Sequence, residues 1–303
     1  MRALVIGYGS IGARHARILA ELGCNTAVLS SRSINFPLFF SSLDRAIDVH
    51  QPDYVVVASQ TSSHYSDITR LIDVGFTGSV LVEKPLFKTH QELPKNNFKT
   101  FNVAYNLRFH PVIQKVRSIL EGQKIISVNA YVGQYLPDWR PGTDYSKGYS
   151  AFSSMGGGVL RDLSHELDFI SWLAGDWSRL TASGGHFSDL NIDSDDAYGL
   201  LWSAEKCPLI CVQLSYLDRN PTRKFIVNTD KITIESDLNL GTIKTGDLNL
   251  SLPSDRDYTY RKMHEAVING QYHLLCTSVE AYEIMALIKA AEISNQQKIW
   301  VSR

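Results

Sequence analysis

The segment Ala3–Leu22, ALVIGYGSIGARHARILAEL, restricts the fold of this chain more than any other segment. Its apolar run ends at Gly7 and apolar residues at helical spacing follow, which predicts a strand that passes through a glycine-rich turn into a helix. The spacing GxGxxG permits a tight turn, close approach of the backbone to a pyrophosphate, and close packing of the helix on the sheet. N–H groups at the start of such a helix attract phosphate. We therefore predict a dinucleotide site at Gly7, Tyr8, Gly9, Ser10, Ile11 and Gly12, with a turn that holds no nucleotide as the alternative.

The first hundred residues alternate between strand-like and helix-like segments. The predicted strands are Arg2–Ile6, Thr26–Leu29, Tyr54–Ala58, Ser79–Val82 and Thr100–Ala104, and the predicted helices are Ile11–Leu22 and His64–Gly75. This alternation predicts an α/β domain with a doubly wound parallel sheet. We assign residues 1–109 to this dinucleotide-binding domain.

The pattern changes after Pro111. One helix, Val112–Leu120, precedes segments typical of antiparallel strands, which are Ile125–Val132, Leu180–Ser183, Ala197–Ser203, Leu209–Tyr216, Lys224–Val227 and Ile232–Glu235. A single helix, Gly158–Leu173, interrupts the strands, and a final helix, Ser278–Ile293, precedes a short strand, Ile299–Val301. We therefore predict an α+β second domain at residues 110–303.

Length and composition exclude several classes of protein. The 303 residues, of which 44% are hydrophobic, suffice for two domains that each bury a core. The net charge of −1 provides no basic field for nucleic acid, and the longest apolar runs are too short to cross a bilayer. The N-terminal run has no signal-peptide cleavage site, and the four cysteines form no CxxC pair. We expect a cytoplasmic protein with reduced thiols, no metal site, and neither nucleic acid nor membrane as a partner.

The end of the second predicted strand indicates which dinucleotide binds. An NAD site usually carries Asp or Glu there to bind the ribose 2′-OH. In this chain the position reads Ser30-Ser31-Arg32, and no acidic residue lies between Glu21 and Asp44. Two hydroxyls and a guanidinium suit a 2′-phosphate. We therefore favour NADP(H) over NAD(H), with a solvated Arg32 in a variable loop as the alternative.

A candidate catalytic lysine follows the fourth predicted strand. Ligands of parallel sheets bind beyond the carboxyl ends of the strands. Val82-Glu83-Lys84-Pro85 lies at such an end, so we predict that Lys84 faces the cofactor. A solvated surface lysine is the alternative.

A second candidate group lies in the segment GGGVLRDLSHELDFISWL, which begins at Gly156. On one continuous helix Asp162, His165, Phe169 and Trp172 form a stripe, and Asp162 reaches His165 one turn on. A carboxylate beside an imidazole raises the pKa of the imidazole and orients it, which suits proton transfer. The alternative is that both side chains are structural or exposed.

These motifs together resemble the Gfo/Idh/MocA oxidoreductases. The resemblance rests on the N-terminal glycines, Glu83-Lys84-Pro85, Tyr105–Pro111, Gly156–Trp172 and the late segment SVEAYEIMALIKAAEISNQQKIWV, and so covers nearly the whole chain. It implies a Rossmann domain, a second domain with an open-faced antiparallel sheet, and hydride transfer between a nicotinamide and a sugar or cyclitol carbon. It also implies that Lys84 lies near the reacting hydroxyl, often after a cis bond to the proline that Pro85 matches.

The resemblance also bears on the site residues. His165 matches the family's helix histidine through its HxxD continuation to Asp168, but the family's aspartate lies four residues before it, where this chain has Arg161. Asp162 is three residues before, so its register is shifted. LSHELD resembles a subgroup encoded with bacterial surface-sugar pathways. Further cofactor-binding candidates are Ser59, Gln60, His64, Glu83 and Lys84, and further substrate-binding candidates are Tyr105, Asn106 and Arg108.

The loop Gly133–Phe152 fits a sugar substrate, because aromatic faces stack on the C–H faces of pyranose rings. The candidates in it are Tyr135, Trp139, Arg140, Tyr145 and Tyr149. Arg140 suits a carboxylate or phosphate. A loop packed by its own aromatic residues is the alternative.

We thus predict an NADP-dependent sugar oxidoreductase, of bacterial surface-polysaccharide or acidic-sugar biosynthesis, in which His165 transfers the proton, Lys84 polarises the oxygen and Asp162 supports them. The rivals are a redox sensor without turnover and a reaction on a tightly bound nicotinamide that ends in hydrolysis. We also predict a homodimer or homotetramer, because one helix covers only one face of the second sheet. Leu209–Leu217 has apolar residues in both alternation sets, like a strand buried on both sides. Cover by Ser278–Ile293 within the chain is the alternative.

Overall fold

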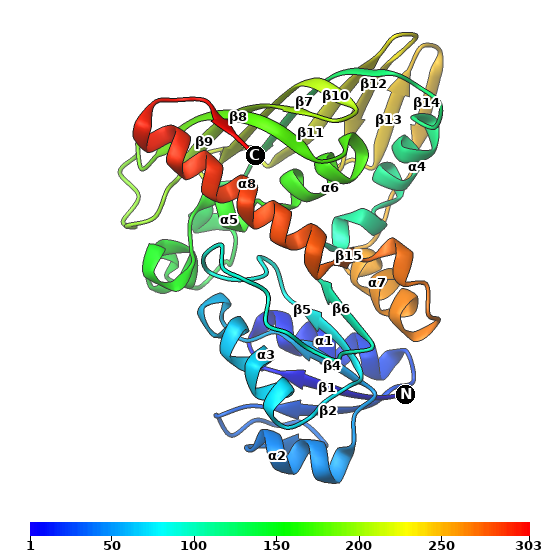
Figure 1. Cartoon of the computed structure of the whole chain (residues 1–303), viewed down its shortest axis with the longest axis vertical. Helices are drawn as coiled ribbons and strands as arrows, with labels where there is room; N and C mark the ends of the chain where they lie inside the picture. Colours follow the sequence, from blue (N-terminus) through cyan, green and yellow to red (C-terminus); the bar gives the residue numbers. More distant parts are fainter. The chain divides into compact units, whose positions relative to one another are not determined.

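The N-terminal alternation of strands and helices forms a seven-stranded sheet in the computed structural model, which describes residues 1–303 (Figure 1). The strand order is β15-β6-β5-β4-β1-β2-β3, and only the pairing of β15 with β6 is antiparallel. The strands are β1 Arg2–Ile6, β2 Asn25–Leu29, β3 Phe39–Phe40, β4 Tyr54–Val57, β5 Ser79–Val82, β6 Thr100–Val103 and β15 Cys276–Thr277. The helices are α1 Ser10–Glu21, α2 Leu43–Arg45, α3 His64–Asp73 and α7 Tyr258–Ile268. The predicted doubly wound α/β domain is confirmed.

The chain divides into two units, residues 1–109 with 256–282 and residues 110–255 with 283–303. The predicted second domain of residues 110–303 therefore needs a correction, since 256–282 belong to the first unit. In this segment Met263, Ala266 and Val267 of α7 are buried in one core with residues of β1 and α1, and β15 extends the sheet at β6. The sequence did not show this, because β15 has only two residues and α7 is partly polar, and neither pattern indicates which unit the element packs on.

The second unit contains a nine-stranded sheet of order β14-β13-β12-β11-β7-β10-β9-β8-β16. Only β7 and β10 pair in parallel. The strands are β7 Ile125–Gly133, β8 Trp177–Gly185, β9 Ala197–Ala204, β10 Cys207–Ser215, β11 Thr222–Thr229, β12 Thr233–Asp237, β13 Thr242–Thr245, β14 Leu248–Ser251 and β16 Val301–Ser302. The helices are α4 Pro111–Ile119, α5 Val159–Asp162, α6 His165–Ala174 and α8 Ser278–Gln297, of which α8 begins in the first unit. No helix of the chain is both long and apolar enough to span a membrane.

The single helix predicted for Gly158–Leu173 is wrong. Two helices, α5 and α6, meet at Leu163 and Ser164. At the junction the N–H groups of Ser164 and Glu166 bond carbonyls three residues back, at Arg161 and Leu163, so the regular ladder is interrupted. The break falls between Asp162 and His165, so the two residues belong to different helices and not to one continuous stripe.

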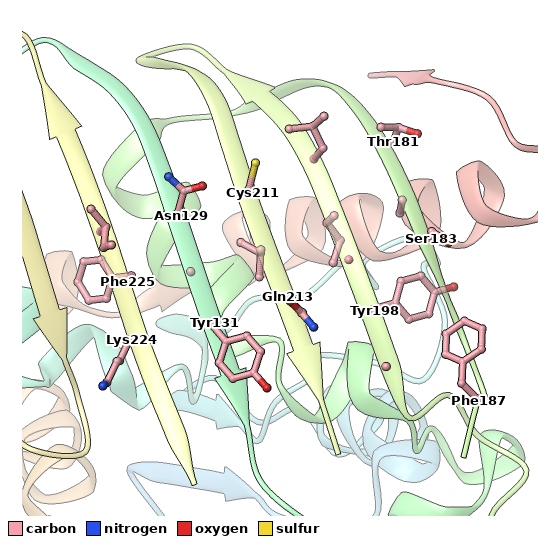
Figure 2. A pocket seen from close by; sticks show the side chains of 18 residues that line it. Asn129, Tyr131, Thr181, Ser183, Phe187, Tyr198, Cys211, Gln213, Lys224 and Phe225 are labelled. Carbon is pink, nitrogen blue, oxygen red and sulfur yellow. The ribbon is translucent and has the colours of Figure 1, made fainter. Parts of the chain in front are cut away.

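One face of the second sheet has no helix on it. Helices α5, α6 and α8 lie on the opposite face (Figure 1), where α8 is tied to β8 by a bond from the Ala182 N–H to Ser294 Oγ. Strand register places two rows of side chains on the uncovered face, partly labelled in Figure 2. The rows are Ile226, Asn129, Cys211, Leu201 and Thr181, and Lys224, Tyr131, Gln213, Gly199 and Ser183. Cover of this face by α8 within one chain is therefore excluded.

Strand β10 is buried on one side only within a single chain. Ile210, Val212 and Leu214 are buried beneath the helices. Leu209 is 47% exposed, and Gln213 is also exposed on the open face. A single chain therefore buries only one of the two alternation sets.

Candidate active site

The glycine-rich turn between β1 and α1 has the geometry of a phosphate cradle. Gly7 has φ +93°, and a Cβ there would meet the Ala58 carbonyl oxygen at 2.6 Å. A Cβ at Gly12 would collide with the Gly7 carbonyl oxygen, so helix and turn pack backbone to backbone. Gly9 caps α1 without a side-chain hydrogen bond, and a Cβ there would meet nothing within 4 Å. Open space before uncapped N–H groups fits the pyrophosphate of a dinucleotide.

The end of β2 lies beside this turn. Ser30 is buried and its Oγ accepts a bond from the Arg32 N–H at 3.1 Å. The Arg32 guanidinium is exposed and donates to the Tyr8 carbonyl oxygen at 3.3 Å. A cationic, solvent-accessible group therefore stands where an NAD site usually has a carboxylate.

Lys84 follows β5, at the same carboxyl edge of the sheet as the glycine turn after β1, because β1, β4 and β5 are parallel neighbours. The Lys84–Pro85 peptide bond is cis. Burial lowers the pKa of the nearby His64, whose Nδ1 lies 3.1 Å from the Pro85 carbonyl oxygen and whose Nε2 lies 3.3 Å from the Ser59 carbonyl oxygen. The Ser59 hydroxyl donates to Asp67 at 2.6 Å. His64 and Ser59, both predicted to bind cofactor, thus brace the loops that end β4 and β5. Gln60 between them is exposed.

Glu83 ends a chain of buried polar side chains that the sequence did not reveal. His15 Nε2 lies 2.8 Å from Glu83 Oε1, His15 Nδ1 lies 2.8 Å from His264 Nε2, and the Tyr54 hydroxyl lies 3.0 Å from His264 Nδ1. Burial opposes ionisation of Glu83, but the bond from His15 and the charges of His15, Lys84 and His64 outweigh it and lower the pKa of this carboxyl. The only sequence signal was the presence of histidines in otherwise apolar helical surfaces, which did not show that they meet.

The three substrate-binding candidates of the first unit are all buried, at Tyr105, Asn106 and Arg108. Asn106 donates to Thr259 at 2.7 Å, and Arg108 donates to the Leu275 carbonyl oxygen at 3.3 Å and to Glu280 at 3.0 Å. These contacts hold the returning segment 256–282 on the first unit. The structure thus gives Asn106 and Arg108 a structural task in addition to the predicted one.

In the second unit, Asp162 is held by hydroxyl groups. Ser150 Oγ and Tyr216 OH each donate to Asp162 Oδ2 at 2.6 Å. Burial, followed by the charge of Asp162, raises the pKa of both Tyr149 and Tyr216 well above 10. His165 is the first residue of α6 and is half-buried. The sequence identified Asp162 and Tyr149, but it did not identify Ser150 and Tyr216, which are distant in sequence.

The aromatic loop after β7 is packed in part by its own chain. The Arg219 guanidinium lies 3.5 Å from the ring centre of Tyr135, and Trp139 packs edge-on against Tyr216. The Trp139 indole donates to the Gln134 carbonyl oxygen at 3.1 Å, and the Tyr145 hydroxyl accepts from the Asn191 N–H at 3.2 Å. Arg140 is exposed and lies over the Tyr149 ring at 5.8 Å. Tyr135, Trp139, Tyr145 and Tyr149 are each partly exposed.

The fold and the glycine cradle define a Rossmann-type dinucleotide-binding protein with a second domain built on a sheet. Two family models match the chain: the oxidoreductase family with an NAD-binding Rossmann fold matches residues 1–97, and the GFO/IDH/MocA C-terminal domain matches residues 113–235. The chain belongs to the Gfo/Idh/MocA family and is an oxidoreductase.

Individual relatives agree with this assignment. The chain is 26% identical over 175 residues to a levoglucosan dehydrogenase of Pseudarthrobacter phenanthrenivorans, a match that spans 55% of this chain and 44% of that protein. The solved structure of levoglucosan dehydrogenase with NADH has a TM-score of 0.85 at 16% identity, covering 100% of this chain and 98% of the other. The WlbA dehydrogenase from Bordetella pertussis, in complex with NADH and UDP-GlcNAcA, has a TM-score of 0.79 at 17% identity, with coverage of 100% and 98%.

Proposed function

We propose that this protein transfers a hydride between a nicotinamide cofactor and a carbinol or carbonyl carbon of a sugar or sugar derivative. The observation that carries the proposal is the position of Lys84 after β5, at the same carboxyl edge of the parallel sheet as the glycine cradle that follows β1. A nicotinamide, when bound, accepts or supplies the hydride, and the protein orients the reactants and handles the proton. A cation next to the reacting oxygen stabilises negative charge that develops there.

Within this proposal two residues act on the reacting oxygen. Lys84 polarises the reacting oxygen, and His165 takes or gives its proton, because an imidazole is suited to proton transfer near neutral pH. Asp162 supports His165 from a carboxylate whose position is fixed by Ser150 and Tyr216. Proton transfer of this kind contributes about 10²–10⁴-fold to a rate.

We propose NADP(H) as the preferred cofactor. The support is the exposed Arg32 guanidinium beside the turn and the lack of an acidic residue between Glu21 and Asp44. The solved structures of similar proteins contain NADH, so NAD(H) is the competing choice.

The proposed substrate is a sugar, bound in part by the half-exposed Tyr135, Trp139, Tyr145 and Tyr149 and by Arg140. Relatives named for levoglucosan and crystallised with UDP-GlcNAcA support this class. We place the reaction in the cytoplasm, in bacterial surface-polysaccharide or acidic-sugar biosynthesis. A screen of nucleotide sugars and free acidic sugars for a change in NADPH absorbance identifies the substrate.

The catalytic roles are tested by Lys84→Ala and His165→Ala. Each variant is expected to lower kcat by about 10²–10⁴-fold on the substrate that the screen finds, because each loses a group that acts on the reacting oxygen. NADPH binding, measured by calorimetry, is expected to persist. Lys95→Ala and His273→Ala, which change exposed residues outside the predicted site, serve as matched controls. Wild-type turnover in both site variants would place the chemistry elsewhere.

A further inference from the structure

A continuous chain of buried polar side chains crosses the core of the first unit. It begins at Tyr54 in β4, passes through His264 in α7 and His15 in α1, and ends at Glu83 after β5. Tyr54, His264 and His15 are completely buried, and Glu83 is buried. Their surroundings are otherwise apolar, with Val5, Leu19 and Met263 in the same core cluster. Apolar residues would fill this space at lower cost in desolvation, so the chain calls for an explanation.

The hydrogen bonds of this chain run without a gap from Tyr54 to the carboxylate of Glu83. Burial lowers the pKa of His264 well below 6.5, and burial raises the pKa of Tyr54 well above 10, so both groups are neutral. The His15 Nε2–H donates to the Glu83 carboxylate, and the direction of the other two bonds depends on the tautomers of His15 and His264. Two protonated imidazoles would set N–H against N–H at 2.8 Å. A change at Tyr54 or His264 therefore reaches Glu83 through His15.

The other oxygen of Glu83 connects this chain to Lys84. Glu83 Oε2 accepts the backbone N–H of Lys84 at 3.2 Å, and the Lys84 charge contributes to the lowered pKa of Glu83. The other titratable groups that face Glu83 are His64 and Tyr260. On the far side of the cis bond, His64 holds the carbonyl oxygens of Pro85 and Leu86.

We propose that Tyr54, His264 and His15 are positioning residues that act through Glu83 to fix the orientation and the charge of Lys84. The inference rests on the proposed function of Lys84. It gives the segment 256–282 a part in the site, because His264 enters the polar chain from α7.

The test measures the pKa of the Lys84 ammonium in the protein without cofactor, by NMR of ¹³C-methylated lysines with Lys84→Arg for assignment. Glu83→Gln removes the carboxylate charge and keeps the shape, so it is expected to lower the pKa of Lys84. His264→Leu breaks the row of hydrogen-bonded side chains and is also expected to lower the pKa of Lys84. Tyr54→Phe is expected to lower this pKa by a smaller amount. His15→Leu is expected to lower the pKa of Lys84 as well. His15→Gln keeps a hydrogen-bond donor for Glu83, so its Lys84 pKa is expected to stay close to the wild-type value. Misplacement of Lys84 also predicts a kcat about 10- to 100-fold lower with an unchanged KM.

The control is His50→Leu, because His50 is equally buried in this unit but bonds only the Ala3 carbonyl oxygen, at 3.0 Å. It is expected to lose stability and to leave the pKa of Lys84 unchanged. An unchanged pKa of Lys84 in folded His264→Leu overturns the proposal, and if that variant does not fold, an unchanged pKa in Glu83→Gln does so. Failure of the proposed function would appear instead as wild-type turnover of Lys84→Ala.

Discussion

At the scale of single residues, the proposed preference for NADP(H) rests on Arg32. Its guanidinium is exposed, and its bond to the Tyr8 carbonyl oxygen places it beside the turn that holds the pyrophosphate. The sequence sufficed for this inference, because an acid that is missing from a known position can be read directly. The partners of Asp162 and Glu83 could not be read in this way, since Tyr216 lies 54 residues from Asp162 and His15 lies 68 residues from Glu83.

Arg32→Ala is expected to weaken NADPH binding by about 1.5–3 kcal/mol, the usual worth of a hydrogen bond to a charged group. NADH binding is expected to stay nearly the same, because NADH has no 2′-phosphate. Isothermal calorimetry of both cofactors measures the two effects, with exposed Arg45→Ala as the control. Equal affinity of the wild-type protein for NADPH and NADH would refute the assignment.

At the scale of elements, the bounds of the long apolar strands and helices were predicted well from the sequence, whereas the break between two helices and the short polar strands were not. β1 and β5 have the predicted bounds, and β4 and α1 deviate by at most a residue at either end, because burial imposes a strong pattern on them. The break between α5 and α6 stayed hidden, because Val159, Leu163 and Leu167 suit one helix as well as two. β13 and β14 were missed because their short sequences, TIKT and LNLS, are largely polar or exposed.

The start of α5 gives a prediction about stability. The Asp195 carboxylate accepts the Leu160 N–H at 2.9 Å, and burial raises the pKa of Asp195 to about 6. The folded state therefore binds a proton that the unfolded state, with a carboxyl pKa near 3.9, releases. Between about pH 4 and 6 this difference lowers the free energy of unfolding as pH rises, by about 1–3 kcal/mol in total.

Asp195→Asn keeps an oxygen that accepts the Leu160 N–H and cannot ionise. The variant is expected to gain stability over the wild type at pH 8, and to lose that advantage at pH 4. Urea unfolding of both proteins measures the difference in their free energies of unfolding at pH 8 and again at pH 4, and the two differences are then compared. A difference in stability that does not change with pH would show that Asp195 is not the titrating group.

At the scale of the whole molecule, the uncovered face of the nine-stranded sheet bears on assembly. It carries Ile226 at 39% exposure, with Leu201 and Cys211 in the same row (Figure 2). With α8 on the opposite face, we expect a second copy of the chain to cover this one, as a twofold contact buries two such faces at once.

Ile226→Asp is expected to convert the assembly to single chains, because a twofold contact would bury two carboxylates without partners. Light scattering at low micromolar concentration checks this prediction. The wild type should give a multiple of 34.0 kDa, and the variant a mass near 34.0 kDa. Val49→Asp, at a side chain 66% exposed in the first unit, is the control. A wild-type mass of one chain would rule out the assembly.

The return of residues 256–282 to the first unit determines the order in which a ribosome can complete the molecule. Until residue 282 has emerged, β6 is an open edge and the core around β1 lacks Met263 and its neighbours. The nascent chain therefore keeps an unfinished N-terminal sheet exposed to wrong partners during synthesis of nearly the whole second sheet. An expression fragment that stops at residue 109 would carry the same defect permanently.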